Sequence, residues 1–349
     1  MIKLTSLLIG SGDSFLLENG NNKYLIDSGG NQKLILRLIP EKINLAICTH
    51  NDSDHCNGFI GILKSNKHII DEIWLPGIWT SIIDFIKRKK LNAEFFWQEF
   101  EHVHLNNMQI HNNYDINELL TNSDENINEF TDDLGFLSDY YDYYYRYYCH
   151  LAFSPPINDK IVFNINRILE ITKLAYEKGV AIKWFFPDIS GGSVINNFKP
   201  VNSKHLLNMK KIKNESLLFF YQLAYLTSEN EYSLVFEYQI NDIPRILFTA
   251  DSVISIPYAY SDEIIITAPH HGSKSNRLVY TSIHGKNLIW IRSDRPSFSR
   301  PCVEFKNLTK KYCLSCTATN PVKREEIIFK FENGRWNYSK GIKCNCNQF

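Results

Sequence analysis

Six consecutive residues most strongly constrain the fold of this chain: His50-Asn51-Asp52-Ser53-Asp54-His55. They come shortly after the apolar segment 43–48. The apolar segment predicts a buried strand, and a turn after it can fold four ligand-type side chains around one point. Imidazoles and carboxylates together suit Zn, Mn or Fe better than Ca. A helix N-cap needs only one such residue, so we predict a metal site rather than a simple capping turn.

Length and composition limit the number of domains and the classes of function that this chain can have. The 349 residues suffice for one large domain or two modest ones, and 44% hydrophobic content allows a sizeable core. Lys+Arg and Asp+Glu both number 38, and this neutral balance argues against tight, purely electrostatic binding of long duplex nucleic acid. The sequence shows neither a secretory signal nor an apolar run of transmembrane length, so we expect a cytoplasmic protein without a membrane partner. Its eight cysteines are then expected to be reduced or metal-bound.

The order of predicted elements indicates an α/β fold. Apolar runs alternate with Gly, Asp and Asn turns, beginning with a hairpin whose turn is 19–22, and strands then alternate with helices, which predicts mixed sheets covered by helices. A helix is predicted at 58–64 and a second one ends at Gly179. Further strands are predicted at 72–75, 180–186, 231–238, 244–249, 263–267 and 288–292, with a C-terminal hairpin over 327–338.

A segment rich in Asn, Asp, Glu and aromatic residues interrupts this pattern. We divide the chain into an N-terminal half (1–78), an inserted, mainly helical subdomain (79–160), a C-terminal half (161–300) and a cysteine-containing extension (301–349). The insertion includes a tyrosine-rich run at 140–148, which is too apolar for simple disorder. Packing as an amphipathic helix is favoured over stacking on the bases of a single strand.

Two more predicted strands end in ligand-type residues. Asp251 follows the apolar residues 246–248, and His270 and His271 follow 264–266. Strand ends align along one edge of a sheet, so these side chains can converge with those of the first motif. Two metal ions about 3.5–4 Å apart polarise a phosphoryl or carbonyl oxygen and hold a hydroxide at neutral pH. Taken singly, Asp251 could be a helix cap and His271 a buried core histidine.

These motifs resemble, in the right order, those of the metallo-β-lactamase-fold hydrolases, and more narrowly the hydrolase domain of the ComEC/Rec2 competence proteins. The resemblance covers about residues 1–75 and 162–300. It rests on these segments: Gly10–Leu16, Ile26–Gly29, Thr49–His55, Asn230–Val235, Ala250-Asp251 and Pro269–Ser273.

The resemblance implies an αββα sandwich of two mixed sheets with one or two divalent ions, Zn or Mn, at the sheet edges. His50 and Asp52 would bind the first ion, and Asp54 and His55 the second. Asp251 would bridge the two ions. His270 or His271 would complete the second site, and we prefer His270 because it lies nearer the strand end. Asp54 would also be catalytic.

The resemblance also implies substrate contacts. Ser273 and Lys274 are expected catalytic residues that would contact a substrate phosphate, although Lys274 is equally compatible with a solvated surface residue. Asp13 of the opening motif is a further candidate contact. The family's late His-Pro is replaced by Arg300-Pro301, whose guanidinium could grip a phosphate. A separate third-motif histidine has no match, since the context of His205 differs.

The C-terminal cysteines form a second candidate metal site. C-x-x-C paired with C-x-C can make a structural zinc site, and the sequence offers Cys313, Cys316, Cys344 and Cys346. Ordinary thiols are the slightly favoured alternative.

Three functions follow from these patterns. We favour a metal-dependent phosphodiesterase, a nuclease that cleaves DNA through a metal-activated hydroxide. Related stand-alone proteins occur beside ATPases in bacterial antiviral loci, which suggests an effector with such a protein partner and with the insertion as a lid. The alternatives are a hydrolase of small esters, lactones or thioesters, and a degenerate fold kept as an assembly partner.

Overall fold

The structure is a computed structural model that describes residues 1–89, 155–206, 226, 230, 232–253, 259–294, 300–314, 326–340, 344 and 346. The chain divides into two compact units, one comprising Met1–Trp79, Arg167–Met209 and Ser228–Phe349, the other Thr80–Asn166 and Lys210–Thr227. All the residues that build the site described below belong to the first unit. Among the described helices, none is both long and apolar enough to span a bilayer.

A nine-stranded sheet forms one half of the first unit, in the order β17-β16-β1-β2-β3-β4-β5-β6-β8. Strands β1 to β3 form an antiparallel meander, and the predicted opening hairpin is confirmed by the pairing of β2 with β3. Strands β3 to β6 run parallel. The bounds are Ile2–Ser6 (β1), Phe15–Asn19 (β2), Asn22–Ile26 (β3), Lys42–Ile47 (β4), Ile69–Pro76 (β5), Ala181–Pro187 (β6), Ser203–His205 (β8), Ile327–Glu332 (β16) and Arg335–Lys340 (β17).

A six-stranded sheet forms the other half, in the order β15-β14-β12-β10-β9-β7. Strands β10, β12, β14 and β15 are parallel, and the runs of buried apolar residues in β12 and β14 are typical of strands covered on both faces. The bounds are Phe198–Pro200 (β7), Phe236–Ile240 (β9), Ile243–Phe248 (β10), Ile264–Thr267 (β12), Leu288–Arg292 (β14) and Lys311–Cys313 (β15). A separate two-stranded pair joins Ala259–Tyr260 (β11) to His284–Gly285 (β13).

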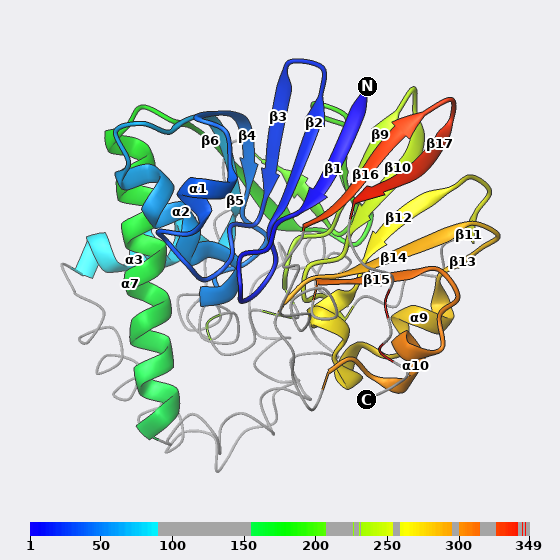
Figure 1. Cartoon of the computed structure of the whole chain (residues 1–349). Helices are drawn as coiled ribbons and strands as arrows, with labels where there is room; N and C mark the ends of the chain where they lie inside the picture. The colour runs from blue at the N-terminus through cyan, green and yellow to red at the C-terminus, as the bar shows by residue number, and fades with distance from the viewer. Residues whose placement is uncertain are drawn as a thin grey trace, which may run out of the picture. The chain divides into compact units, whose positions relative to one another are not determined.

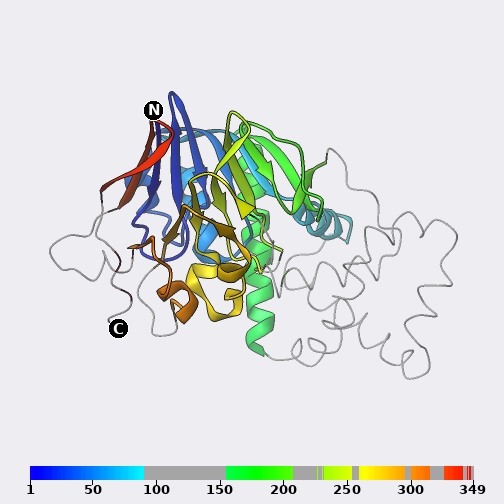
Figure 2. The same ribbon diagram turned by 90° about the vertical axis from the view of Figure 1, so that its right-hand side faces the viewer.

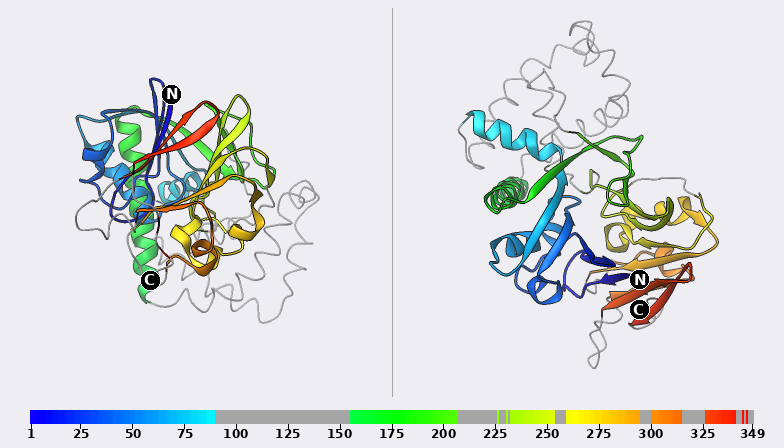
Figure 3. Two further views of the ribbon diagram at one scale, coloured as in Figure 1. Left: turned by 45° about the vertical axis from the view of Figure 1, so that its right-hand side comes forward. Right: turned by 90° about the horizontal axis from the view of Figure 1, so that it is seen from above.

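The two sheets face each other across one apolar core (Figure 3), to which Leu17 and Trp74 contribute from the first sheet and Phe236 from the second. A second core lies on the outer side of the six-stranded sheet, where Tyr280 of α9 and Phe305 of α10 pack. Helices α1 and α2 lie outside the nine-stranded sheet (Figure 1). This layering confirms the predicted α/β fold class. The helices are Ile35–Leu38 (α1), Ser53–Lys64 (α2), Ile78–Lys89 (α3), Pro155–Glu177 (α7), Val279–Ser282 (α9) and Val303–Lys306 (α10), with short 3₁₀ turns at Pro269–Gly272 (η1) and Lys274–Asn276 (η2).

Some segments differ from the sequence-based expectation. Helix α2 begins at Ser53, not at residue 58, because the ligand-type residues themselves form its first turn. The predicted C-terminal hairpin is confirmed, but β16 pairs with β1, so the extension 301–349 contributes strands to both sheets (Figure 2). Most of the insertion 79–160, including the tyrosine-rich run, lies outside the described residues.

Candidate metal centre

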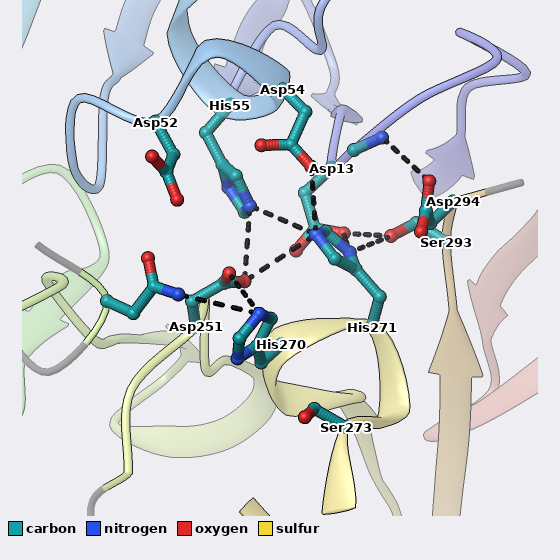
Figure 4. Close-up of polar contacts among 12 residues, drawn as sticks. Asp13, Asp52, Asp54, His55, Asp251, His270, His271, Ser273, Ser293 and Asp294 are labelled. Carbon is teal, nitrogen blue, oxygen red and sulfur yellow. Dashed lines mark hydrogen bonds and ion pairs between the residues drawn. The ribbon is translucent and has the colours of Figure 1, made fainter. Parts of the chain in front are cut away.

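The carboxyl ends of strands from both sheets meet at one edge of the sandwich (Figure 4). Strand β4 leads to His50, β10 to Asp251, and β12 to His270 and His271. Parallel strands end at the same edge, which is why residues far apart in the sequence gather here. Ala250 (φ 48°), His270 (φ 47°) and His271 (φ 54°) adopt left-handed conformations that fold the chain sharply at these ends.

The first set of ligand-type atoms belongs to His50, Asp52 and Asp251, which lie within 4.8 Å of one another. His50 Nε2 is 3.9 Å from Asp52 Oδ2 and 4.0 Å from Asp251 Oδ2. Asp52 occupies the N-cap position of α2, yet its side chain makes no capping hydrogen bond. One cation bound at about 2.1 Å by each residue fits this spacing.

His50 is prepared as a neutral ligand. Burial, and to a lesser extent the charge of His55, lowers the pKa of His50 to about 4. Thr49 Oγ1 donates to Asp27 Oδ2 (2.8 Å) and therefore accepts from His50 Nδ1 (3.0 Å). The proton on Nδ1 leaves a lone pair on Nε2, which is buried and has no hydrogen-bond partner among the described residues. Such an orphaned nitrogen is costly, and a divalent cation would satisfy it.

The second set comprises His55, His271 and Asp251 with the neighbouring Asp13, all four buried and within 4.8 Å. His55 Nε2 lies 3.1 Å from Asp251 Oδ1 and 3.3 Å from His271 Nε2. Asp54, in the first turn of α2, places Oδ2 3.4 Å from His271 Nε2. Asp251 therefore faces the first set with Oδ2 and the second with Oδ1, which is the arrangement of a bridging carboxylate.

The structure places His271, rather than the preferred His270, beside His55. The left-handed turn over Pro269–Gly272 directs His271 into the second set, although it is one residue farther from the strand end. His270 Nε2 accepts from Arg300 Nη2 (2.8 Å) and lies 3.4 Å from Asn230 Nδ2 and 3.6 Å from Asp251 Oδ2. His270 therefore belongs to neither ligand set, and its lone pair faces a guanidinium.

Asp13 and Arg300, the expected substrate contacts, have other partners here. Asp13 is buried, and its Oδ1 lies 3.0 Å from His271 Nδ1 and accepts from Ser293 Oγ. Asp13 thus orients a ligand, as a carboxylate behind a metal-binding histidine does. Arg300 is partly exposed and lies between His270 and Asp294, whose Oδ2 is 3.9 Å from Nη1.

Asp27 is a site residue that was not among the predicted ones. Its Oδ2 contacts His55 Nδ1 at 2.8 Å, and its Oδ1 accepts from the Thr49 backbone N–H at 2.9 Å. Asp27 therefore orients His55 directly and His50 through Thr49. The sequence carries a usable signal, because Asp27 directly follows an apolar strand, and Asp251 comes three residues after the end of another.

The remaining predicted site residues belong to neither ligand set. Ser273 caps η2 and accepts from the Ser275 backbone N–H, while Lys274 is exposed. His205, on the edge strand β8, donates from Nδ1 to the carbonyl oxygen of Trp184 on β6 and is in neither ligand set. Three of the four predicted zinc cysteines, Cys313, Cys344 and Cys346, lie together; Cys316 lies outside the described residues.

Carboxylates control the charge of the second set. Burial alone would lower the pKa of His55, but Asp251 and Asp27 raise it well above the ordinary value. Burial likewise opposes the effect of Asp251 and Asp13, which raise the pKa of His271 to about 10. Burial would raise the pKa of Asp54, yet the hydrogen bond with His271 and the charge of His55 lower it. A cation that binds here would therefore take the place of protons on the two imidazoles.

Comparison with known proteins gives a family match for the first part of the chain. The profile of the metallo-beta-lactamase superfamily matches residues 8–77, which include β4 and the first motif. Among solved structures, the chain is similar to a hydrolase, AbOPH, described as belonging to the beta lactamase superfamily. The identity is 12%, the TM-score is 0.33, and the match covers 70% of this chain and 57% of that one. A likeness this weak carries no functional weight. No curated protein matches the chain.

Residues 8–77 are thus similar to the metallo-beta-lactamase superfamily, and the two facing sheets are consistent with that fold. The narrower resemblance to the competence-protein hydrolase domain stays a prediction.

Proposed function

We propose that this protein is a metal-dependent hydrolase, and specifically a phosphodiesterase that cleaves DNA. The observation that carries the proposal is that buried Asp251 belongs to both of two adjoining ligand sets. Paired ions suit in-line displacement at phosphorus, because one can act on the attacking oxygen and the other on the leaving oxygen. When bound, the ions would supply a water of lowered pKa and neutralise charge on a phosphoryl oxygen.

The residues of the chain take complementary roles in this proposal. One ion would be held by His50 and Asp52, the other by His55, His271 and Asp54, with Asp251 between them. The orphaned Nε2 of His50 supports the fit of a borderline cation such as Zn or Mn. Behind the ligands, Asp27 and Asp13 hold the imidazoles in the required tautomers.

The substrate side of the proposal rests on cations beside the centre. Lys274 lies two residues after the turn that carries His271, and Arg300 contacts His270. These two cations would attract a negatively charged phosphate, which favours a phosphodiester over an uncharged ester or lactone. On the resemblance alone, we extend the proposal to a cytoplasmic effector of antiviral defence with a protein partner such as an ATPase encoded nearby.

Cleavage of single-stranded, double-stranded and plasmid DNA with added Mn²⁺ or Zn²⁺ tests the proposal. Asp54→Ala combined with His55→Ala should lower the cleavage rate at least about 100-fold, because it removes two ligands of one ion. Asp71→Asn is the matched control: Asp71 is an exposed carboxylate near the start of β5, paired with Lys42, and its change should leave the rate unaltered.

Bound metal should be measured on the same samples. A wild-type chain that retains two ions but cleaves none of the three DNAs would contradict the nuclease proposal and favour a small ester as substrate. A wild-type chain that binds no ion would contradict the hydrolase proposal itself and favour the assembly partner.

A further inference from the structure

Three cysteines from two distant parts of the sequence meet at the end of β15. Cys313 is the last residue of that strand and is fully buried, and Cys344 and Cys346 follow β17. Their Sγ atoms all lie within 4.8 Å of one another, with Cys344 and Cys346 at 2.9 Å. That separation exceeds a disulfide bond of about 2.05 Å. A tetrahedral Zn²⁺ with Zn–S bonds of about 2.3 Å places its sulfurs about 3.8 Å apart, a spacing within the 4.8 Å limit of this cluster, and Cys344 and Cys346 would separate by about 0.9 Å to bind it.

A buried arginine points at the same sulfurs. Arg292 ends β14 and is 0% exposed, and its Nη1 donates to Cys313 Sγ at 3.1 Å. A guanidinium removed from water needs negative charge nearby, and a neutral thiol is only a weak acceptor. Asp294 supplies part of that charge, and a thiolate at Cys313 would supply more. The Cys346 backbone N–H also faces Cys344 Sγ, at 3.4 Å, as donors around metal-bound thiolates do.

We propose that Cys313, Cys344 and Cys346 supply three of the four ligands of a structural zinc–thiolate site, separate from the candidate metal centre. On binding, each thiol releases its proton to solvent and each sulfur donates an electron pair to Zn²⁺, with no change in oxidation state. Three thiolates and Zn²⁺ carry a net charge of −1, which the guanidinium of Arg292 would balance. This charge balance would favour the burial of Arg292 against Cys313.

The zinc site would hold the segment after β17 in place and would also be connected to the candidate metal centre. Cys344 and Cys346 belong to the segment after the C-terminal hairpin, and zinc would join them to the core strand β15. The same Arg292 donates from Nε to the carbonyl oxygen of His271 at 2.6 Å. Arg292 is thus a positioning residue, because it links the thiolates to the left-handed turn that places His271 in the second ligand set.

Cobalt substitution tests this proposal, because thiolate-to-cobalt charge transfer gives near-ultraviolet absorption that nitrogen and oxygen ligands do not give. The candidate metal centre contains no sulfur ligand among the described residues, so the signal is specific to the cysteines. We expect the full chain, purified with Co²⁺, to show this absorption. Cys344→Ser should abolish it and lower the zinc content of the zinc-loaded protein by one ion per chain. Cys344 is half-buried, which makes this variant less disruptive than one at Cys313.

Cys302→Ser is the matched control, since Cys302 is buried at the N-cap of α10 outside the cluster and should keep both signals. The absorption of the unmutated cobalt protein does not depend on any variant folding. Its absence, or an unchanged zinc content in Cys344→Ser, would overturn the proposal. A disulfide between Cys344 and Cys346 in the protein purified under reducing conditions would also overturn it. None of these outcomes bears on DNA cleavage, so the two proposals can fail separately.

Discussion

Single residues behind the ligands determine the chemistry of this site. Asp27 and Asp13 are buried carboxylates that contact the Nδ1 atoms of His55 and His271. Each leaves the Nε2 atom of its histidine directed at Asp251. The binding properties of the centre therefore depend on residues that would not touch the ions.

Asp27→Asn tests this dependence. The substitution keeps the size of the side chain but removes the charge that holds His55 and, through Thr49, His50. We expect metal affinity to fall about 10- to 100-fold. Competition with a chelating dye measures it, and Asp71→Asn is the control, since loss of an exposed ion pair costs little. An affinity within twofold of wild type would show that Asp27 does not orient the ligands.

At the scale of elements, the site depends on close packing between the β1–β2 loop and the first turn of α2. A Cβ added at Gly12 (φ 83°) would lie 1.6 Å from the carbonyl oxygen of Asp54. The backbone N–H of Gly12 also donates to Asp294 Oδ1 at 3.2 Å. The loop therefore brings Asp13 to the centre only because residue 12 has no side chain.

Gly12→Ala should displace α2 and with it Asp54. We expect this variant to lose metal binding. Its free energy of unfolding should fall by well over the roughly 1–2 kcal/mol that left-handed backbone strain costs by itself. Gly10→Ala is a close control, because Gly10 has nearly the same φ (88°) but open space around its Cβ. Metal titration and denaturant unfolding of both variants give the comparison. Equal effects of the two substitutions would mean that backbone strain, and not the contact with Asp54, is what restricts residue 12 to glycine.

At the scale of the whole molecule, the C-terminal hairpin joins the two sheets. Trp336 of β17 belongs to the core between them, and its Nε1 donates to the carbonyl oxygen of Arg245 at the start of β10 (3.1 Å). Its backbone N–H donates to Glu263 Oε1 at 2.7 Å, just before β12. The last strand of the nine-stranded sheet thus contacts the first residues of two strands in the other sheet.

Trp336→Ala should therefore lower the free energy of unfolding by about 3–5 kcal/mol, because it leaves a large cavity at the edge of the core. Trp336→Phe keeps an aromatic ring but leaves the Arg245 carbonyl without its indole donor, and should cost about 1–2 kcal/mol. Urea unfolding monitored by circular dichroism measures both changes. Similar losses for the two variants would assign the stabilisation to the hydrogen bond instead of the buried ring.

Local pattern was enough to predict the fold class and most strands. Hydrophobic periodicity fixes which segments are buried, and residues such as His50 and Asp251 can be located because each follows an apolar strand that ends in a sharp turn. The same local signal marks Asp27, although it was not used there. These features depend on neighbours in the sequence, which is why they can be inferred without a structure.

Tertiary structure alone decided which of two adjacent histidines enters the ligand set. His270 and His271 are equivalent in sequence, and only the left-handed turn at 269–272 directs His271 toward His55 and His270 toward Arg300. Asp13 likewise looks like a loop residue until the β1–β2 loop closes over α2. The contacts of His271 with His55 and Asp13 join residues more than 200 positions apart. Their geometry depends on how strands pair and loops pack, which no local pattern encodes.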